Sequence, residues 1–136
     1  MTYKLRIVTP EGIVFDDQVD KVVANTVTGE ICILAKHINL VTVIDVGKVK
    51  VCQGEKIIYG ACSGGLLTIK DGECSIVATT FECAEDIDVA RAQAAKERAE
   101  EKLKSDEDAK RQEMYKAKLK RAICRLKVSS MANGSN

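Results

Sequence analysis

The spacing of hydrophobic residues along the chain changes once, near Glu85. Before this point, short runs rich in Val, Ile and Leu alternate with polar residues, and Gly, Asn or Asp separate the runs. Alternation with a period of two is typical of strands that bury one face, and regular turn residues favour a sandwich or barrel. Residues 1–84 therefore predict an antiparallel β-sandwich of about ten short strands.

Two details of this sandwich follow from the pattern. Asp45-Val46-Gly47 and Gly64-Gly65 separate apolar runs and are predicted to be turns between strands. Residues 31–34 are apolar throughout, which favours a strand buried on both faces. We therefore expect short strands, of which the one at residues 31–34 is buried on both faces.

After Glu85 the pattern becomes helical. Residues 86–128 contain no Gly and no Pro, and Ala, Lys, Arg and Glu dominate. Apolar residues recur every three or four positions, as on one face of an α-helix. They form two stripes, Ala92, Ala95, Ala99 and Leu103, then Tyr115, Leu119, Ala122 and Leu126. The pattern predicts an antiparallel two-helix hairpin over residues 85–136.

The hairpin is interrupted at Lys104-Ser105-Asp106. Asp86 or Asp88 is expected to cap the first helix and Ser105 the second, because such side chains accept hydrogen bonds from the N–H groups of a first turn. The first stripe is mostly Ala, and each buried methylene contributes only about 0.8 kcal/mol. We expect a hairpin that is held weakly and can open.

Composition excludes several classes of protein. A net charge of +1 argues against a dedicated nucleic-acid-binding protein. No apolar stretch approaches the roughly 18 residues that span a bilayer, and residues 1–4 lack an apolar signal segment. We expect a cytoplasmic protein, or one that is peripheral to a membrane.

The six cysteines are expected to be small, buried, reduced side chains. None forms a Cys-x-x-Cys pair, and the only histidine is His37, so no metal site is expected. A nucleophile and base formed by Cys32 and His37 is an alternative, but no third group that would orient the base is evident.

Arg121 and Arg125 are candidates for ligand binding. They lie four residues apart and so share a helical face, where two guanidinium groups suit phosphate oxygens. In an antiparallel hairpin the second helix returns toward Asp88 and Arg91. The sequence contains no Gly-x-x-x-x-Gly-Lys-Ser/Thr loop, so nothing in it suggests that the chain hydrolyses nucleotide. The alternative is that the arginines are solvated or pair with the acids that precede the first helix.

A basic run follows Met114, with no acidic residue after it. One reading is a solvated helix face whose cations lie favourably near a helix C-terminus. The other is a surface that contacts an acidic partner. The run consists of Lys116, Lys118, Lys120, Arg121, Arg125 and Lys127.

The chain also contains an ordered series of short motifs: Ile7-Val8-Thr9-Pro10-Glu11-Gly12 with Phe15, Gly29-Glu30-Ile31 with Ile33-Leu34, His37, Leu40-Val41-Thr42, Gly64-Gly65, Ala84-Glu85-Asp86-Ile87-Asp88, Arg91-Ala92, Arg121-Ala122 and Arg125-Leu126. In this order, followed by a helix hairpin, the series resembles the bacterial epsilon subunit of the F-type (rotary) ATP synthase over nearly the whole chain. Cys32 and Lys36 stand where that family commonly has Gly, and Asn39 where it commonly has Pro.

The resemblance implies a non-catalytic subunit of the central stalk that couples ion translocation to ATP synthesis. It implies that the sandwich binds the gamma subunit and the membrane c-ring, the latter through Glu30 and His37. The extended arm would contact the catalytic alpha and beta subunits through the basic run and inhibit ATP hydrolysis, at the cytoplasmic face of a bacterial cell membrane. The alternative is a free-standing nucleotide-sensing adaptor.

The same resemblance implies ATP as a regulatory ligand of the folded arm, alone or with Mg²⁺, and no required cofactor. The family motif Ile/Leu-Asp-x-x-Arg-Ala stands at residues 87–92. The implied ATP-binding residues are Ile87, Asp88, Arg91, Ala92, Arg121 and Arg125, with Glu82 and Arg98 resting on the family alone.

Overall fold

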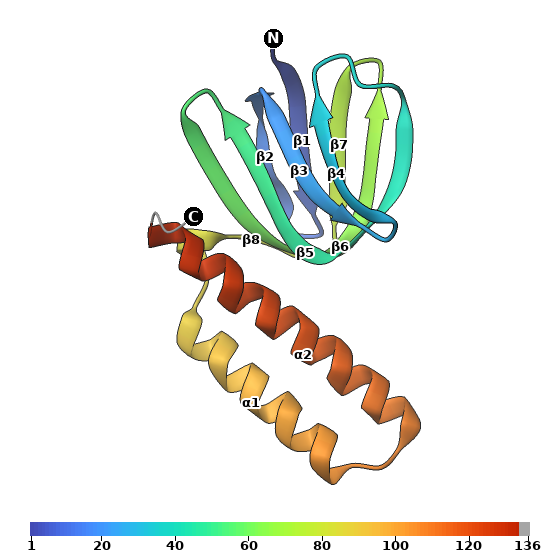
Figure 1. Cartoon of the computed structure of the whole chain (residues 1–136), viewed down its shortest axis with the longest axis vertical. Coiled ribbons are helices and arrows are strands. Elements are labelled where there is room, and N and C mark those ends of the chain that lie inside the picture. Colours follow the sequence, from blue (N-terminus) through green and yellow to red (C-terminus); the bar gives the residue numbers. More distant parts are fainter. Residues whose placement is uncertain (134–136) are drawn as a thin grey trace. The chain divides into compact units, whose positions relative to one another are not determined.

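The structure, a computed structural model, describes residues 1–133 and divides into two compact units, Met1–Cys83 and a helical unit that begins at Ala84 (Figure 1). Residues 134–136, which the predicted hairpin range included, lie outside the described residues. The first unit contains eight strands: β1 (Tyr3–Thr9), β2 (Gly12–Val19), β3 (Lys21–Thr26), β4 (Gly29–Leu34), β5 (Leu40–Gln53), β6 (Lys56–Lys70), β7 (Glu73–Ala78) and β8 (Phe81–Cys83).

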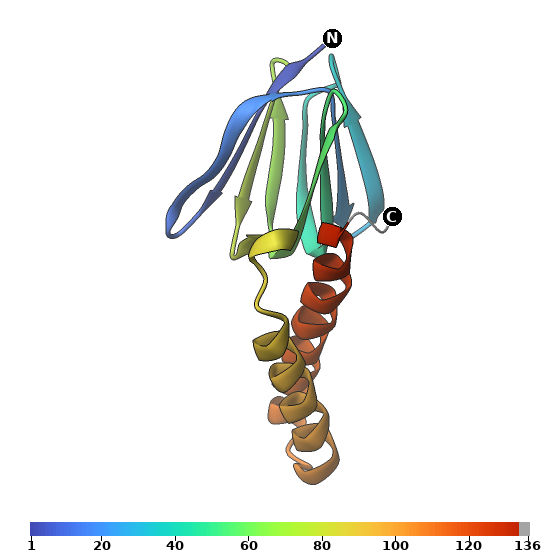
Figure 2. The ribbon, with the colours of Figure 1, turned by 90° about the vertical axis from the view of Figure 1, so that its left-hand side faces the viewer.

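The strands form a sandwich because β5 and β6 are long enough to belong to both layers. The order of paired strands is β2-β1-β7-β6-β5-β3-β4, with β8 also paired to β6. The start of β5 and the end of β6 lie in the layer with β7, β1 and β2, whereas their other halves lie with β3, β4 and β8. Figures 1 and 2 show these two layers from two sides.

The predicted fold class is confirmed, with two corrections. There are eight strands rather than about ten, because Asp45-Val46-Gly47 and Gly64-Gly65 lie inside β5 and β6 instead of forming turns. Gly65 has φ +154°, and a Cβ there would lie 2.1 Å from the Val77 carbonyl oxygen, so the change of layer needs glycine. The pairing is also not wholly antiparallel, since β1 and β7 run parallel.

Large aliphatic side chains fill the space between the two layers. Alternate residues of β1, β3 and β7 point inward. The largest completely buried side chains include Leu5, Ile7, Ile33, Ile44, Leu67 and Ile76. The Tyr3 hydroxyl donates a hydrogen bond of 2.6 Å to the Ile33 carbonyl, and burial raises the pKa of Tyr3. The prediction of a doubly buried strand at residues 31–34 is wrong. In β4 only Ile33 is buried, because this strand ends the sheet order and turns Cys32 and Leu34 to solvent.

The second unit is the predicted helix hairpin, α1 (Val89–Ser105) and α2 (Ala109–Ser129), followed by a 3₁₀ turn (η2, Ser130–Asn133) and preceded by another (η1, Ala84–Asp86). Asp88 caps α1 as expected, accepting from the Arg91 N–H at 3.0 Å. The cap predicted for α2 is wrong: Ser105 ends α1, and Asp108 accepts from the Lys110 and Arg111 N–H groups at 2.9 and 3.2 Å.

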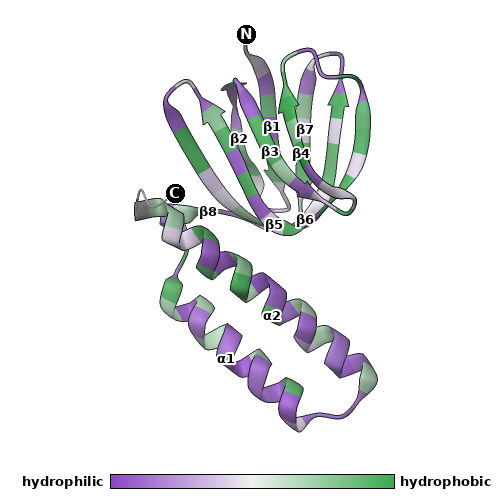
Figure 3. Cartoon of the chain, in the orientation of Figure 1, coloured by the Kyte–Doolittle hydropathy of each residue, from purple (hydrophilic) through white to green (hydrophobic). Residues whose placement is uncertain are grey.

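The two helices pack together through small side chains. Ala92 and Ala99 of α1 and Ala122 of α2 are buried. Figure 3 shows that most of the remaining helical surface is hydrophilic. Alanine lets the helices approach closely but removes little apolar surface from water. The interface between α1 and α2 therefore buries little apolar surface for the length of the two helices.

The cysteines differ more in exposure than the sequence predicted. Cys62 and Cys74 are buried, and burial raises the pKa of the Cys74 thiol to about 12. Cys32 is exposed, because it lies on the outer side of β4, and the other three are half-buried. In the part of the chain that the structure describes, no helix is long and apolar enough to cross a membrane.

Candidate functional site

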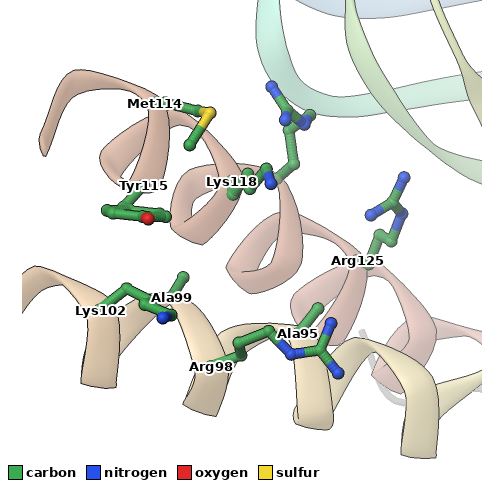
Figure 4. A pocket seen from close by; sticks show the side chains of 9 residues that line it. Ala95, Arg98, Ala99, Lys102, Met114, Tyr115, Lys118 and Arg125 are labelled. Carbon is green, nitrogen blue, oxygen red and sulfur yellow. The ribbon is translucent and has the colours of Figure 1, made fainter. Parts of the chain in front are cut away.

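A groove of about 340 Å³ runs between α1 and α2 (Figure 4). Its volume falls at the lower end of the range of about 300–1,000 Å³ that is usual for small-molecule sites. The lining residues are Ala95, Arg98, Ala99 and Lys102 from α1, and Met114, Tyr115, Lys118, Arg121 and Arg125 from α2. All of them belong to the helical unit, so the groove is a property of the hairpin alone.

The α1 wall combines small and cationic side chains. Figure 4 shows Ala95 and Ala99 directed toward α2. Arg98 and Lys102 are four residues apart and lie beside the alanine stripe, on one flank of the helix. The alanines thus keep the space between the helices open, and the long cationic side chains can reach over it.

The α2 wall carries cations at regular helical spacing. Met114, Lys118, Arg121 and Arg125 follow each other at intervals of four, three and four residues and so lie on one flank of α2. Tyr115 is half-buried, and Figure 4 shows its ring directed toward α1. This wall therefore offers three cationic groups beside a flat aromatic surface.

The groove is strongly electropositive. Its lining contains five cationic side chains, and within residues 1–133 no acidic side chain belongs to it. In the same described part of the chain, no carboxylate forms an ion pair with Arg98, Lys102, Lys118 or Arg121. Like charges on neighbouring helical positions repel one another. A bound polyanion would relieve this repulsion and gain charge-assisted hydrogen bonds.

Three of the implied ATP-binding residues, Arg98, Arg121 and Arg125, line the groove together. Arg91 is exposed and lies seven residues before Arg98, on the same face of α1. The others lie outside the lining: Ile87 and Ala92 are buried, and Asp88 caps α1. Glu82 belongs to β8 in the sandwich.

Sequence analysis missed Lys102, Met114 and Tyr115, and it assigned Lys118 only to the basic run. Helical spacing could have found the two lysines. Lys102 follows Arg98 by four residues, and Lys118 precedes Arg121 by three. No sequence signal distinguishes Tyr115 from an ordinary interface residue.

The basic run forms two separate surfaces rather than one. Lys118, Arg121 and Arg125 lie on the groove flank of α2. Lys116, Lys120 and Lys127 are separated from one another by four and seven residues and lie on the opposite flank, outside the groove lining. On that flank the Lys116 ammonium lies 3.5 Å from the Glu113 carboxylate. We call this second set the outer lysines.

The two residues implied in contact with a membrane ring lie at opposite ends of β4. Glu30 is exposed near the start of the strand, where it pairs with Asn25. His37 follows the end of the strand, after a turn in which Lys36 has φ +65°. The His37 Nδ1 atom lies 2.9 Å from the Ile38 carbonyl oxygen, so this ring nitrogen contacts a backbone carbonyl.

The outer surface of the sandwich carries an apolar row across five strands. Cross-strand pairing joins Val43 of β5 to Leu66 of β6, Leu66 to Val77 of β7, Val77 to Val8 of β1, and Val8 to Ile13 of β2. The exposed fractions of Val43, Leu66, Val77 and Ile13 are 49%, 42%, 54% and 62%. Paired residues share a face of a sheet, so these side chains form one continuous exposed row, the apolar row.

Comparison with known families matches both units. The profile of the ATP synthase delta/epsilon chain β-sandwich domain matches residues 2–84, and that of the delta/epsilon chain long α-helix domain matches residues 85–130. The ATP synthase epsilon chain of Desulforamulus reducens is 44% identical over 131 residues, covering 94% of this chain and 97% of that protein. The epsilon chain of Halalkalibacterium halodurans is 40% identical over 132 residues, covering 94% and 97%.

Two solved structures share the fold. A chain of the Euglena gracilis mitochondrial ATP synthase (OSCP/F1/c-ring) gives a TM-score of 0.79 at 22% identity and covers 96% of this chain and 80% of that chain. A chain of the Tetrahymena thermophila mitochondrial ATP synthase (central stalk/c-ring) gives a TM-score of 0.63 at 13% identity, covering 93% and 95%. The resemblance found in the sequence is confirmed. The chain belongs to the family of ATP synthase epsilon chains, which are non-catalytic subunits of the rotary F-type enzyme.

Proposed function

We propose that this epsilon chain works in the central stalk as a docking subunit with an ATP-sensitive inhibitory arm. The sandwich joins the rotor, and the hairpin folds when ATP is bound and extends when ATP is scarce. The observation that carries the proposal is the acid-free cationic groove between two helices whose fully buried contact residues are the small side chains Ala92, Ala99 and Ala122.

The groove supports nucleotide binding because it can hold several phosphates at once. Arg98 belongs to α1, whereas Arg121 and Arg125 belong to α2. Guanidinium groups bind phosphate oxygens through paired hydrogen bonds. A nucleotide in contact with all three would bridge the helices. Its binding free energy would then act directly on the folded state of the hairpin.

The energies are of the right size for a switch. A ligand shifts an equilibrium only by its differential affinity for the two states. A ligand at 100 times its Kd stabilises the state that binds it by about 2.7 kcal/mol. That amount is comparable with the burial of a few methyl groups, at about 0.8 kcal/mol each. The alanine interface is therefore thin enough for a metabolite concentration to decide between the folded and extended arm.

The apolar row supports docking of the sandwich onto a protein partner, which we propose is the gamma subunit. Exposed contiguous apolar surface is typical of protein–protein interfaces. The next row of the same face begins with the exposed Val41 on β5 but is otherwise polar, with Thr68 and Ser75 beside Arg6, whose guanidinium contacts Asp16 at 3.2 Å. An apolar patch next to a polar rim is the usual arrangement of an interface. Glu30 and His37 keep their proposed role at the c-ring.

We propose that the outer lysines contact the catalytic subunits when the arm is extended. They lie on the flank of α2 opposite the groove, so a nucleotide in the groove does not cover them. ATP would then relieve inhibition by holding the helices together rather than by neutralising the inhibitory surface. Hydrolysis by the assembled enzyme at low ATP should rise when the outer lysines are replaced by Ala.

Isothermal titration calorimetry of the full chain with ATP tests the central proposal. Combined Arg121→Ala and Arg125→Ala substitution should lower the affinity by at least about tenfold, since one hydrogen bond to a charged group contributes roughly 1.5–3 kcal/mol. Combined Lys116→Ala and Lys120→Ala substitution removes the same charge from the opposite flank of α2 and should leave the affinity unchanged. Equal ATP affinities in all three proteins would refute the site.

Docking has a separate test. Leu66→Asp combined with Val77→Asp places two charges in the apolar row and should abolish co-purification with the gamma subunit. The matched control, Thr68→Asp with Ser75→Asp, places the same charges in the polar row of the same face. If both variants assemble normally, the gamma subunit binds elsewhere on the sandwich.

A further inference from the structure

The loop between β4 and β5, residues 35–39, is tied to the rest of the sandwich by a side chain. The ladder between β5 and β6 ends where Leu40 pairs with Ile69. Just beyond this pair, the Asp71 backbone N–H donates a hydrogen bond of 3.0 Å to the Oδ1 atom of Asn39. The Asn39 amide thus takes the place of a backbone acceptor, as asparagine side chains often do in turns. It links the loop to the turn between β6 and β7.

Both linked segments have an unusual backbone. Lys36 in the loop and Asp71 in the turn have φ +65° and +51°, and within residues 1–133 they are the only residues other than glycine with positive φ. Lysine seldom adopts this region. Backbone of this kind persists where its surroundings hold it, and it is concentrated at binding sites and switch regions. The hydrogen bond from Asp71 to Asn39 joins these two segments directly.

The loop also presents an apolar side chain to solvent. Ile38 is 78% exposed, and among the large hydrophobic residues of the described chain only Met1 is more exposed. One exposed apolar residue is ordinary, but Val41 and Val43 of β5 follow it with exposed fractions of 65% and 49%. Val43 belongs to the apolar row. A line of exposed apolar residues therefore leads from the apolar row along β5 to the loop that carries His37.

From these observations we infer that Asn39 is a positioning residue for docking onto the c-ring. The inference rests on the proposed function, in which His37 contacts the ring. The hydrogen bond between Asn39 and Asp71 holds residues 35–39 in one conformation before binding, so that His37 and Ile38 meet the ring already ordered. Ordering a loop during association lowers the affinity, and a loop that is ordered beforehand avoids this cost. The contact of the His37 Nδ1 atom with the Ile38 carbonyl orders the imidazole within the same loop.

The test measures binding of a purified c-ring in detergent to the complex of the full chain with the gamma subunit. Asn39→Ala should weaken binding by about threefold to tenfold, the size expected when a flexible segment must be ordered on binding. Asn39→Pro should bind as the wild type does, because proline fixes φ and stiffens the loop without a side-chain acceptor. Proline is also the residue that the family commonly has at this position.

The matched control is Asp71→Asn, which keeps the backbone donor and tolerates positive φ, and which should bind within about twofold of the wild type. Hydrogen exchange reports the bond itself. The Asp71 amide should exchange faster in Asn39→Ala, whereas the amides of β1–β7 should be unchanged, which also verifies that the variant is folded.

The outcomes separate the inference from the proposed contact. Equal binding by Asn39→Ala and the wild type overturns the positioning role. Loss of binding in both Asn39→Ala and Asn39→Pro also overturns it, because the Asn39 side chain would then touch the c-ring itself. In either case the proposed contact stands if His37→Ala weakens binding. If neither His37→Ala nor Ile38→Ala weakens binding, the proposed contact fails and the inference fails with it.

Discussion

The sandwich and the hairpin differ greatly in the amount of buried apolar surface that stabilises each of them. The sandwich encloses completely buried Ile, Leu and Val side chains from both layers, and each contributes about 1.5–3 kcal/mol relative to exposure. Apart from the half-buried Leu103, Tyr115, Leu119 and Leu126, the interface between α1 and α2 is closed by Ala92, Ala99 and Ala122. One methyl group from each contributes about 0.8 kcal/mol. The same chain thus combines a sandwich with one strongly preferred structure and a hairpin whose folded and extended states are expected to be close in free energy.

This difference matches the tasks proposed for the two units. A docking surface such as the apolar row depends on strand register, because a shift by one residue would turn Leu66 and Val77 inward. A deep core holds that register. A sensor needs the opposite property, since a ligand can select between two states only when their free energies differ by a few kcal/mol.

The largest effect is expected in the sandwich core. Ile76 is completely buried, so Ile76→Ala leaves a cavity and should lower the free energy of unfolding of the sandwich by about 2–5 kcal/mol. Urea unfolding, followed by the amide signals of β1–β7, measures this loss. A loss below about 1 kcal/mol would mean that the core tolerates cavities and that the contrast with the hairpin is overstated.

A smaller effect is expected from enlarging the helix interface. Ala99 is only 4% exposed, and Ala99→Leu should force α1 and α2 apart at a cost of about 1–3 kcal/mol. Spin labels on the two helices should report a longer and broader distance distribution, with β-strand signals unchanged. Ala94, which is exposed, provides the control substitution Ala94→Leu. Unchanged distances in both variants would show that the alanines are not what allows close approach.

Loss of the α2 cap should have a still smaller effect. Asp108 accepts from two backbone N–H groups, and Asp108→Ala should destabilise the start of α2 by about 0.5–2 kcal/mol. Hydrogen exchange of the first turn of α2 should become faster. The neighbouring exposed residue supplies the control, Glu107→Ala. Equal exchange in the two variants would deny Asp108 its capping role.

Acid should loosen the turn of the hairpin slightly. The hydrogen bond from the Asp108 N–H and the nearby Arg111 guanidinium hold the pKa of Asp106 below its usual range. Because the folded-state pKa is lowered, the stabilisation is complete above the unfolded-state pKa and is lost as pH falls through the folded-state value. Chemical shifts of residues 103–112 between pH 7 and pH 2 should show this transition. Asp106→Asn should remove it, and a transition that persists in that variant would assign it to another group.

The fold was largely predictable because period-two and helical spacings leave clear marks. The exceptions concern choices between similar local signals. Gly64-Gly65 reads as a turn, yet here positive φ angles bend β6 between the two layers. The parallel pairing of β1 with β7 joins residues far apart in sequence and has no local signature. Ser105 and Asp108 are both good caps, and the position at which α1 ends decides between them.

The candidate site was predictable in part. Arg121 and Arg125 have helical spacing, and Arg98 came from the family resemblance alone. Helical spacing from Arg98 could have found Lys102. Tyr115 emerges as a site residue only when α1 and α2 are placed side by side, because it belongs to a surface shared by two helices. The division of the basic run into groove cations and outer lysines becomes visible only when the residues are placed around the axis of α2. A count of charges along the sequence does not reveal it.

Amide hydrogen exchange of the full chain, with and without ATP, tests the central claim most directly. At 100 times the Kd, ATP should slow exchange in residues 89–129 by about a hundredfold, since the folded hairpin gains about 2.7 kcal/mol. Exchange in β1–β7 should stay the same, and at the same ATP concentration the slowing in the hairpin should fall to about tenfold or less in the Arg121→Ala and Arg125→Ala variant. Unchanged exchange in the helices, or equal slowing in sandwich and hairpin, would contradict an ATP-gated arm on a fixed docking unit.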